Sequence, residues 1–430
     1  MSDFFSFDTL SLHAGQTLDP EFGSRAQPIH QTTSYVFSDT DTASSLFNLE
    51  RGGHVYNRIS NPTVGVLEQR VAALEGGSAA VCVASGMSAV FCALTALVSQ
   101  GDHIVASANM YGGNISLLKN TLPRFGITST FVDPTDIKAI EGAIQDNTKI
   151  VFGELIGNPG LSVMDIEAVA KICTNHHIPL MIDGTFNTPY LCRCFDYGAN
   201  IIVHSLTKWM GGHGTSIGGV VVDGGNFDWG ATDKYTTLTE AYAPFSGINF
   251  WEEFGPSAFA TRIRAEAMRD FGPSMSPMNA FLLLQGIETL SLRMDRHLSN
   301  TKELLQYLNN HEQVSWVNHP DMPDHDSHNI AKKYMPKGAG SIITFGVKGG
   351  RDAGKAFIEN VKLASHLANV GDAKTLIIHP ATTTHSRIDA EALVAAGITE
   401  DMIRISVGIE NVNDITQDFN NGFRVAKKFI

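Results

Sequence analysis

The feature that most constrains the fold of this chain is a series of short, continuously apolar runs in its first half. The seven runs are rich in Val and Ile and lie at 79–85, 103–107, 129–133, 149–155, 178–183, 200–206 and 218–223. Strands buried on both faces have this composition, whereas half-exposed strands alternate apolar and polar residues. Helical stretches separate several runs, which is the pattern of a mostly parallel sheet with helices on both faces. We therefore predict a large α/β domain, in which the last run is equally compatible with an antiparallel edge strand.

The rest of the chain falls into three regions. Residues 1–60 are polar with little periodicity, which predicts an irregular arm that docks on another surface. Residues 224–273 form a second irregular region, rich in aromatic side chains. Beyond a long helix expected at 277–310, apolar runs become fewer, which predicts a smaller α/β domain. We therefore divide the chain into an N-terminal arm at 1–60, a large domain at 61–275 and a small C-terminal domain at 276–430.

Helical and strand periodicity place individual elements in these regions. Val64, Leu67, Val71 and Leu74 recur at helical spacing, which predicts an amphipathic helix with one buried face at 63–74. A second, strongly apolar helix is expected at 87–98. In the C-terminal domain we expect strands at 315–319, 341–347 and 402–408 and helices at 350–361 and 411–427.

Charge and cysteine usage limit the partners and the compartment. The 430 residues include 31 Lys and Arg against 44 Asp and Glu, a net charge of −13, which argues against nucleic acid or an anionic membrane as main partner. Charged residues make up only 17%, below the roughly 25% of an average domain, which indicates surface hidden in a core or in subunit contacts. The sequence contains no run of 18 apolar residues, its first residues do not predict a secretory signal, and five cysteines do not suit a disulfide scaffold. We expect a cytoplasmic protein.

Chemically useful residues follow three of the predicted strands, at the edge where parallel sheets collect ligands. Ser85-Gly86-Met87 opens a helix, whose free N–H groups suit a phosphate, although a plain strand–helix turn has the same sequence. Asp183 ends a buried strand, where a carboxylate needs a cation or donors, or caps the next turn. Lys208 follows Ser205 and Thr207 and precedes a glycine cluster; it either extends to the surface or forms a Schiff base as a desolvated amine.

Together these residues meet the needs of pyridoxal phosphate. That cofactor requires an amine, a carboxylate for its ring nitrogen and anion donors for its phosphate. A dinucleotide-dependent oxidoreductase is a weaker alternative, because the chain lacks the glycine fingerprint of dinucleotide binding. The Cys192-x-Cys194 pair and His176-His177 match no standard zinc spacing, so we expect no metal site.

The chain resembles the Cys/Met-metabolism PLP-dependent enzymes of fold type I over essentially its whole length. The segments that carry the resemblance, in family order, are YNRISNPT (56–63), VCVASGMSA (81–89), MYGGN (110–114), IGNPG (156–160), HSLTKWMGGHG (204–214) and IRISVGIE (403–410). The segment 369–385 is similar to the O-acetylhomoserine sulfhydrylase branch. The fold that the resemblance implies is a seven-stranded, mostly parallel sheet with helices on both faces and a smaller C-terminal α/β domain.

The resemblance implies a role for each matching residue. The residues assigned to the cofactor are Lys208, Asp183, Gly86, Met87, Tyr111, Ser205, Thr207, Thr185, Tyr56 and Arg58. Among them, Lys208 matches the lysine that holds pyridoxal 5'-phosphate as an aldimine and, with Tyr111, is assigned to catalysis. Tyr56 and Arg58 match a pair that reaches the phosphate site of a neighbouring subunit. Arg404, Asn158 and Asn369 match the substrate site, with Arg404 as the clamp for the α-carboxylate.

Two residues depart from the family pattern. Gly184 replaces an Asn that commonly follows the aspartate, and Leu155 stands where the branch often has Thr or Ser. Neither departure is expected to prevent cofactor binding.

The function implied is a γ-replacement in which O-acetyl-L-homoserine and sulfide give L-homocysteine and acetate. The partners implied are these small molecules and further copies of the chain, in a tetramer built from dimers that share active sites. Cystathionine γ-synthase and methionine or cystathionine γ-lyase activities on the same site stay open as alternatives. So does a non-catalytic relative, against which Lys208, Asp183 and Arg404 argue.

Overall fold

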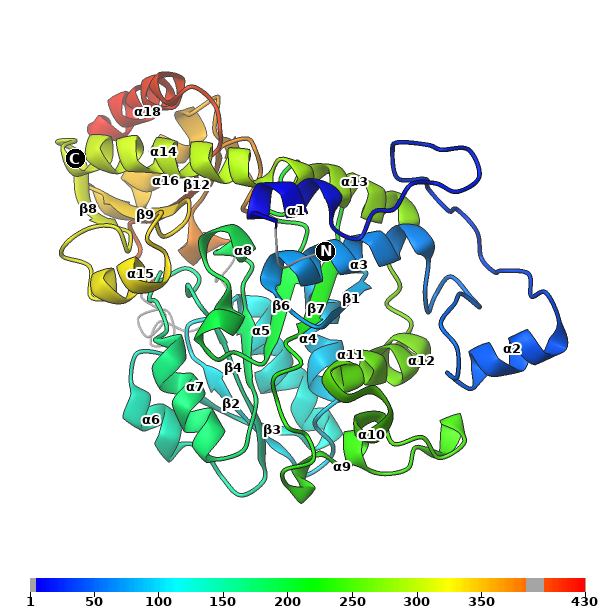
Figure 1. Cartoon of the computed structure of the whole chain (residues 1–430). Helices are drawn as coiled ribbons and strands as arrows, with labels where there is room; N and C mark the ends of the chain where they lie inside the picture. Colours follow the sequence, from blue (N-terminus) through cyan, green and yellow to red (C-terminus); the bar gives the residue numbers. More distant parts are fainter. Residues whose placement is uncertain (1–4, 384–397, 430) are drawn as a thin grey trace.

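The computed structural model describes residues 5–383 and 398–429. Two sheets with their covering helices form the body of the molecule (Figure 1). The larger sheet has seven strands, in the order β1 (Ala79–Val83), β7 (Gly219–Asp223), β6 (Ile201–Ser205), β5 (Leu180–Asp183), β4 (Thr148–Glu154), β2 (His103–Ser107) and β3 (Thr128–Val132). Each strand coincides with one of the seven apolar runs, so the prediction of this sheet is confirmed.

Strand β7 is antiparallel to both of its neighbours, β1 and β6, while the other pairs are parallel. The alternative of an antiparallel strand for this run is therefore confirmed, whereas its position at an edge is wrong, because β7 lies inside the sheet and the edges are β1 and β3. Residues 206–218 contain no helix, and a parallel return normally needs a helical crossover. After β6 the chain therefore reverses direction and forms β7, which lies between β6 and β1, the strand that precedes the candidate phosphate turn.

Helices cover both faces of the large sheet. On one face lie α4 (Gly86–Thr95) and α11 (Ala258–Arg262), and on the other α3 (Pro62–Glu75), α7 (Ile166–Asn175) and α13 (Pro277–Glu288). The predicted face of α3 is confirmed, since Val64, Leu67, Val71 and Leu74 are all buried. The shorter helices of this part of the chain are α5 (Gly112–Ser116), α6 (Ile137–Gly142) and α8 (Thr188–Leu191).

The smaller sheet has five strands, in the order β10 (Ser365–His366), β11 (Leu376–Ile378), β12 (Met402–Ser406), β9 (Ile342–Val347) and β8 (Val314–Asn318). The three predicted strands are present, but β10 and β11 were not predicted, because two or three residues carry no periodicity. The helices α16 (Gly350–Asn360) and α18 (Val412–Ala426) confirm two predictions, and α15 (His328–Tyr334) is additional. The long helix expected at 277–310 is interrupted at Thr289, where α13 ends and α14 (Leu290–Asn309) begins.

The two regions expected to be irregular contain short helices, so these expectations are wrong in part. Within 1–60 lie α1 (Phe7–His13), which packs against α3 and α13, and α2 (Thr40–Phe47), which extends away from the body (Figure 1). Within 224–273 lie α9 (Thr236–Thr239), α10 (Phe250–Phe254), α11 and α12 (Arg269–Phe271), linked by 3₁₀ and π turns. Most of these helices span only one or two turns, which is too short for a hydrophobic period to be recognised. No helix of the described ranges is long and apolar enough to cross a membrane.

Candidate active site

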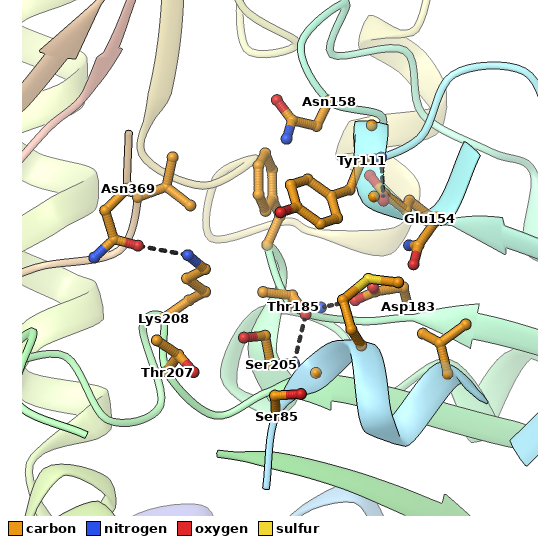
Figure 2. Close-up of a pocket in the computed structure, with 18 of the residues that line it drawn as sticks. Ser85, Tyr111, Glu154, Asn158, Asp183, Thr185, Ser205, Thr207, Lys208 and Asn369 are labelled. Carbon is orange, nitrogen blue, oxygen red and sulfur yellow. Dashed lines mark hydrogen bonds between the residues drawn. The ribbon is translucent and has the colours of Figure 1, made fainter. Parts of the chain in front are cut away.

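A pocket of about 460 Å³ opens at the carboxyl ends of β4, β5 and β6 and is bounded by the N-terminus of α4. From the smaller sheet, β12 and the loop before β11 close its other side. Its lining includes the predicted residues Gly86, Met87, Tyr111, Asn158, Asp183, Thr185, Ser205, Thr207, Lys208, Asn369 and Arg404 (Figure 2). The volume lies in the range of cofactor and small-molecule sites. Residues from both ends of the chain are thus brought together, as the strand-end argument and the resemblance predicted.

The N-terminus of α4 forms one end of the pocket. Ser85 caps this helix by accepting a hydrogen bond from the Ser88 N–H at 3.1 Å, and the N–H groups of Gly86 and Met87 lie in the same first turn. A Cβ on Gly86 would stand 2.7 Å from the Cβ of Ser205, so only glycine allows this close approach. Free N–H groups at the positive end of a helix suit an anion. The Thr207 hydroxyl is already engaged with the N–H and carbonyl of Gly218, which fixes the turn after β6.

Asp183 marks the opposite end, at the last position of β5. Its carboxylate accepts a hydrogen bond from the Thr185 N–H at 3.0 Å, and the Thr185 hydroxyl accepts one from the Ser205 N–H at 2.9 Å. Burial raises the pKa of Asp183, while the bonds from Thr185 and the nearby His204 oppose that rise. Among the described residues no Lys or Arg pairs with this carboxylate. It therefore suits a cationic ring nitrogen supplied by a ligand.

Lys208 projects into the pocket from the turn after β6. Its amine donates a hydrogen bond to the Asn369 side-chain oxygen, which comes from the loop between β10 and β11 (Figure 2). Burial, helped by the positive charge of Arg404, lowers the pKa of Lys208 to about 8. A buried lysine with a lowered pKa has a larger uncharged fraction, which is the nucleophilic form.

The buried Arg293 of α14 fixes the turn that carries Lys208. Its guanidinium donates to the carbonyl oxygens of Trp209 at 2.6 Å and Met210 at 3.2 Å, and to Gly286 at 2.7 Å. Sequence reasoning missed this support, because the contact joins residues 84 positions apart.

Arg404 of β12 provides the second cation of the pocket. The residue is only 5% exposed, and its guanidinium donates a hydrogen bond to Asn158 at 3.0 Å. Burial lowers its pKa to about 10, so the group keeps its charge at neutral pH. None of the carboxylates within residues 5–383 and 398–429 forms an ion pair with it. A buried arginine without a carboxylate partner suits the carboxylate of a ligand.

Tyr111 lies over the pocket and is 51% exposed. Its ring packs against Gly113, where a side chain would not fit, since a Cβ on Gly113 would lie 2.4 Å from the ring. The Tyr111 N–H donates to the carboxyl group of Glu154 at 2.6 Å (Figure 2). Glu154, Asn114 and Phe186 also line the pocket, and sequence reasoning missed all three. Glu154 ends a predicted strand, so the rule that selected Asp183 applies to it equally.

Tyr56 and Arg58 do not line this pocket. The Arg58 guanidinium donates to the carbonyl oxygen of Arg269 and lies 5.6 Å from the centre of the Tyr56 ring, which is 44% exposed. Within one chain, the pair is therefore separate from the other predicted site residues.

The two departures from the family pattern lie next to the pocket. Leu155 is fully buried in the core. Gly184 follows Asp183 and faces the ring of His204, which is hydrogen bonded to Glu75 at 2.5 Å on the other side of the sheet. A Cβ at position 184 would lie 2.7 Å from the His204 Cε1 atom. The glycine is therefore required by the histidine behind it. His204 itself lies on strand β6.

We expect Gly184→Ala to lower the free energy of unfolding by about 1–3 kcal/mol, because His204 is held by Glu75 and has no room to move. Chemical denaturation of the cofactor-loaded protein measures this change. Gly142→Ala is the matched control, since a Cβ there meets nothing within 4 Å. Equal stability of Gly184→Ala and the unmodified protein would show that His204 does not require the glycine.

The cysteines and histidines that the structure describes outside the pocket do not gather into a metal centre. Within the described residues, no group of three or more His, Cys, Asp or Glu side chains is arranged to hold a metal ion. Cys192 and Cys194 are buried and free, like the other three cysteines. The end of the 369–385 segment, residues 384 and 385, lies outside the described residues.

Comparison with known proteins gives the same family throughout. The Cys/Met metabolism PLP-dependent enzyme family matches residues 8–424. The homocysteine synthase of Schizosaccharomyces pombe is 49% identical over 98% of both chains, and the O-acetyl-L-homoserine sulfhydrylase of Leptospira meyeri is 46% identical over 98% of this chain and 97% of its own. A solved structure of a putative O-acetylhomoserine (thiol)-lyase from Campylobacter jejuni is similar, with a TM-score of 0.95 and 38% identity over 98% of this chain and 100% of its own. That structure contains N'-pyridoxyl-lysine-5'-monophosphate.

Proposed function

Because this chain belongs to the Cys/Met-metabolism PLP-dependent enzymes, we propose that it converts O-acetyl-L-homoserine and sulfide into L-homocysteine and acetate. One observation carries the proposal. A half-buried amine, a strand-end carboxylate, a helix N-terminus and a buried arginine that forms no ion pair with any described residue line the same pocket, in Lys208, Asp183, α4 and Arg404. Two relatives that match over nearly the whole chain are named homocysteine synthase and O-acetyl-L-homoserine sulfhydrylase.

The pocket fits pyridoxal 5'-phosphate, the cofactor of the family. In this proposal the N–H groups of Gly86 and Met87 and the hydroxyl of Ser205 hold the phosphate, and Asp183 holds the ring nitrogen. Thr207 contributes to the phosphate site by turning its hydroxyl proton from the Gly218 carbonyl to the phosphate. Thr185 orients Asp183, and Lys208 carries the cofactor. When bound, the cofactor supplies a ring that accepts the negative charge developing on the substrate α-carbon.

Lys208 also moves the protons of the reaction. With a pKa lowered to about 8, its amine is able to take the proton from the substrate α-carbon and to shuttle a proton at the β-carbon. Asn369 holds this amine in place through its side-chain oxygen. Tyr111, above the pocket, assists the proton transfer. Acetate then leaves from the γ-carbon, and the sulfur atom of sulfide takes its place.

Arg404 and Asn158 orient the substrate. The guanidinium binds the α-carboxylate through two parallel hydrogen bonds, and Asn158 keeps the guanidinium plane in position. This orientation directs the α-proton of the substrate toward Lys208.

A product assay separates the γ-replacement from the other activities that such a pocket supports. The enzyme, loaded with pyridoxal phosphate, is supplied with O-acetyl-L-homoserine and sulfide, with O-acetyl-L-homoserine and cysteine, or with methionine or cystathionine alone. We expect homocysteine and acetate to form much faster in the first reaction. Faster turnover of methionine or cystathionine alone would identify a γ-lyase and overturn the proposal. Faster turnover with cysteine in place of sulfide would identify a cystathionine γ-synthase.

We further propose that the arm at 1–60 contacts a neighbouring subunit, and that Tyr56 and Arg58 complete the phosphate site of that subunit. In one chain the pair lies outside the pocket. The arm also exposes large apolar side chains that a second copy would cover, namely Leu18, Phe22, Val36 and Phe47. The proposed assembly is a tetramer built from two dimers that share active sites. In each chain the proposed large domain spans 61–275 and the small domain spans 276–430. We place the enzyme in the cytoplasm, which its five free, buried cysteines support.

The sharing of sites between subunits predicts a result for mixed dimers. Arg58→Ala alone should weaken cofactor binding by about tenfold, because one charged phosphate contact is lost. A dimer of one Arg58→Ala chain and one Lys208→Ala chain should recover about one working site, since one of its two sites has both residues intact. Cofactor titration and turnover of purified mixed dimers measure both effects. At limiting cofactor, the working site of the mixed dimers should bind the cofactor as tightly as the unmodified enzyme does; turnover that needs the tenfold higher cofactor concentration of Arg58→Ala would contradict a shared site.

A further inference from the structure

Glu154 lies inside the pocket at the carboxyl end of β4 and has no role in the mechanism proposed above. It is 6% exposed, and the strand register pairs it with Asp183 on β5, so the two carboxyl groups lie on the same face of the sheet. No ion pair with Lys or Arg neutralises either group among the described residues. Glu154 is buried and Asp183 is half-buried. Two such adjacent carboxyl groups without a cation favour a state with a single negative charge, because each charge disfavours the other.

The contacts of the two groups indicate which one holds the proton. Asp183 accepts the hydrogen bond from Thr185 and lies near His204, and both favour its charged form. Burial and the charge of Asp183 raise the pKa of Glu154 well above its usual range, although the N–H groups of Tyr111 and Asn158 and the nearby Asn114 side chain oppose that rise. The other titratable groups of the pocket lining are Tyr111, Lys208 and Arg404.

Glu154 also fixes the segment that carries the aromatic ring of the pocket. Its Oε1 atom accepts the Tyr111 N–H at 2.6 Å, at the position immediately before α5 (Figure 2). The buried Asn114 side chain of α5 lies close to both carboxyl groups without a well-formed hydrogen bond to either. A carbonyl oxygen is enough to accept the Tyr111 N–H, so a neutral side chain meets this structural need.

We propose that Glu154 is a positioning residue whose carboxyl group carries a proton in the working enzyme, where it fixes the Tyr111–Gly112 turn and leaves the negative charge on Asp183. The inference rests on the proposed cofactor pocket and does not depend on which sulfur compound is the substrate. A neutral neighbour lets Asp183 serve the cofactor ring nitrogen without a competing carboxylate. Glu154→Gln should therefore preserve this positioning role, because the amide oxygen of the glutamine accepts the same hydrogen bond from the Tyr111 N–H.

Cofactor affinity separates this role from that of an ionised carboxylate. We expect Glu154→Gln to keep the dissociation constant of pyridoxal phosphate within roughly threefold, and Glu154→Ala to raise it by about tenfold through loss of the Tyr111 anchor. Titration of the cofactor-free proteins, followed by the absorbance of the bound cofactor, measures both constants. If Glu154→Gln weakens binding as much as Glu154→Ala does, the charge of Glu154 is needed and the proposal is wrong.

Infrared difference spectroscopy tests the proton itself. The cofactor-loaded protein should show the carbonyl band of a protonated carboxyl group, and that band should be missing from Glu154→Gln. Glu303→Gln, a replacement of an exposed glutamate on α14, should leave the band unchanged. A spectrum in which Glu154→Gln removes only carboxylate bands would overturn the proposal. Product formation by the unmodified enzyme tests the proposed reaction separately, so the two failures are distinguishable.

Discussion

Replacing Lys208 by Ala should reduce the turnover of O-acetyl-L-homoserine by at least about 10⁴-fold, because one residue supplies both the cofactor attachment and the proton transfer. In the structure no second lysine among the described residues lines the pocket, so no neighbouring amine replaces it. The cofactor should still bind at its phosphate end, through α4 and the turn after β6. The measurement is the rate of homocysteine formation with saturating cofactor and sulfide.

Two controls separate this loss from misfolding. Lys171→Ala, on the exposed side of α7, should keep full activity. Lys208→Ala should unfold at nearly the same denaturant concentration as the unmodified protein, because Arg293 holds the turn through its backbone carbonyl groups. If Lys208→Ala retains a large fraction of the activity, the proton transfer belongs to another residue.

Replacing Arg404 by Leu should lower kcat/KM by about 10²–10³-fold, since a buried, charge-assisted contact with the substrate carboxylate contributes about 3–4 kcal/mol. A substrate misplaced by about 1 Å loses on the order of 100-fold in rate, so kcat should fall as well as binding. Steady-state kinetics with varied O-acetyl-L-homoserine separate the two parameters. The dissociation constant of the cofactor should stay nearly unchanged.

Arg404→Lys makes this prediction specific to the planar guanidinium. Lysine keeps the charge but lacks the fork that matches a carboxylate and Asn158, so we expect an intermediate loss. Arg296→Leu, on the exposed side of α14, should leave the kinetics unchanged. Unaltered kcat/KM in Arg404→Leu would mean that the substrate carboxylate binds elsewhere.

Much of the large sheet and of the pocket was predictable from the sequence, because both follow from local patterns. Continuous apolar runs predicted the strands, and the rule that ligands collect at strand ends selected Asp183, Lys208 and Gly86. The same rule applies to Glu154, the last residue of β4, although the sequence analysis did not select it. Arg404 and Asn158 entered through the family resemblance, since their contact joins residues 246 positions apart.

The parts that were not predicted depend on contacts across the fold. β7 lies inside the sheet because β1 and β6 flank it. The apolar sequence of this strand would be the same if the strand lay at an edge, so the sequence alone does not predict its position. Arg293 has no local motif, and its function appears only when α14 packs beside the turn after Lys208. Gly184 looked like a departure from the family, and the ring of His204 behind the sheet explains it.

The account depends above all on Lys208 being the residue that holds the cofactor in this pocket. Borohydride reduction of the cofactor-loaded enzyme fixes the pyridoxyl group to its lysine, and peptide mass spectrometry then locates it. We expect the pyridoxyl group on the peptide that contains Lys208, at about one group per chain, and no labelling of the Lys208→Ala variant. A pyridoxyl group on another lysine, or persistent labelling of Lys208→Ala, would contradict the account.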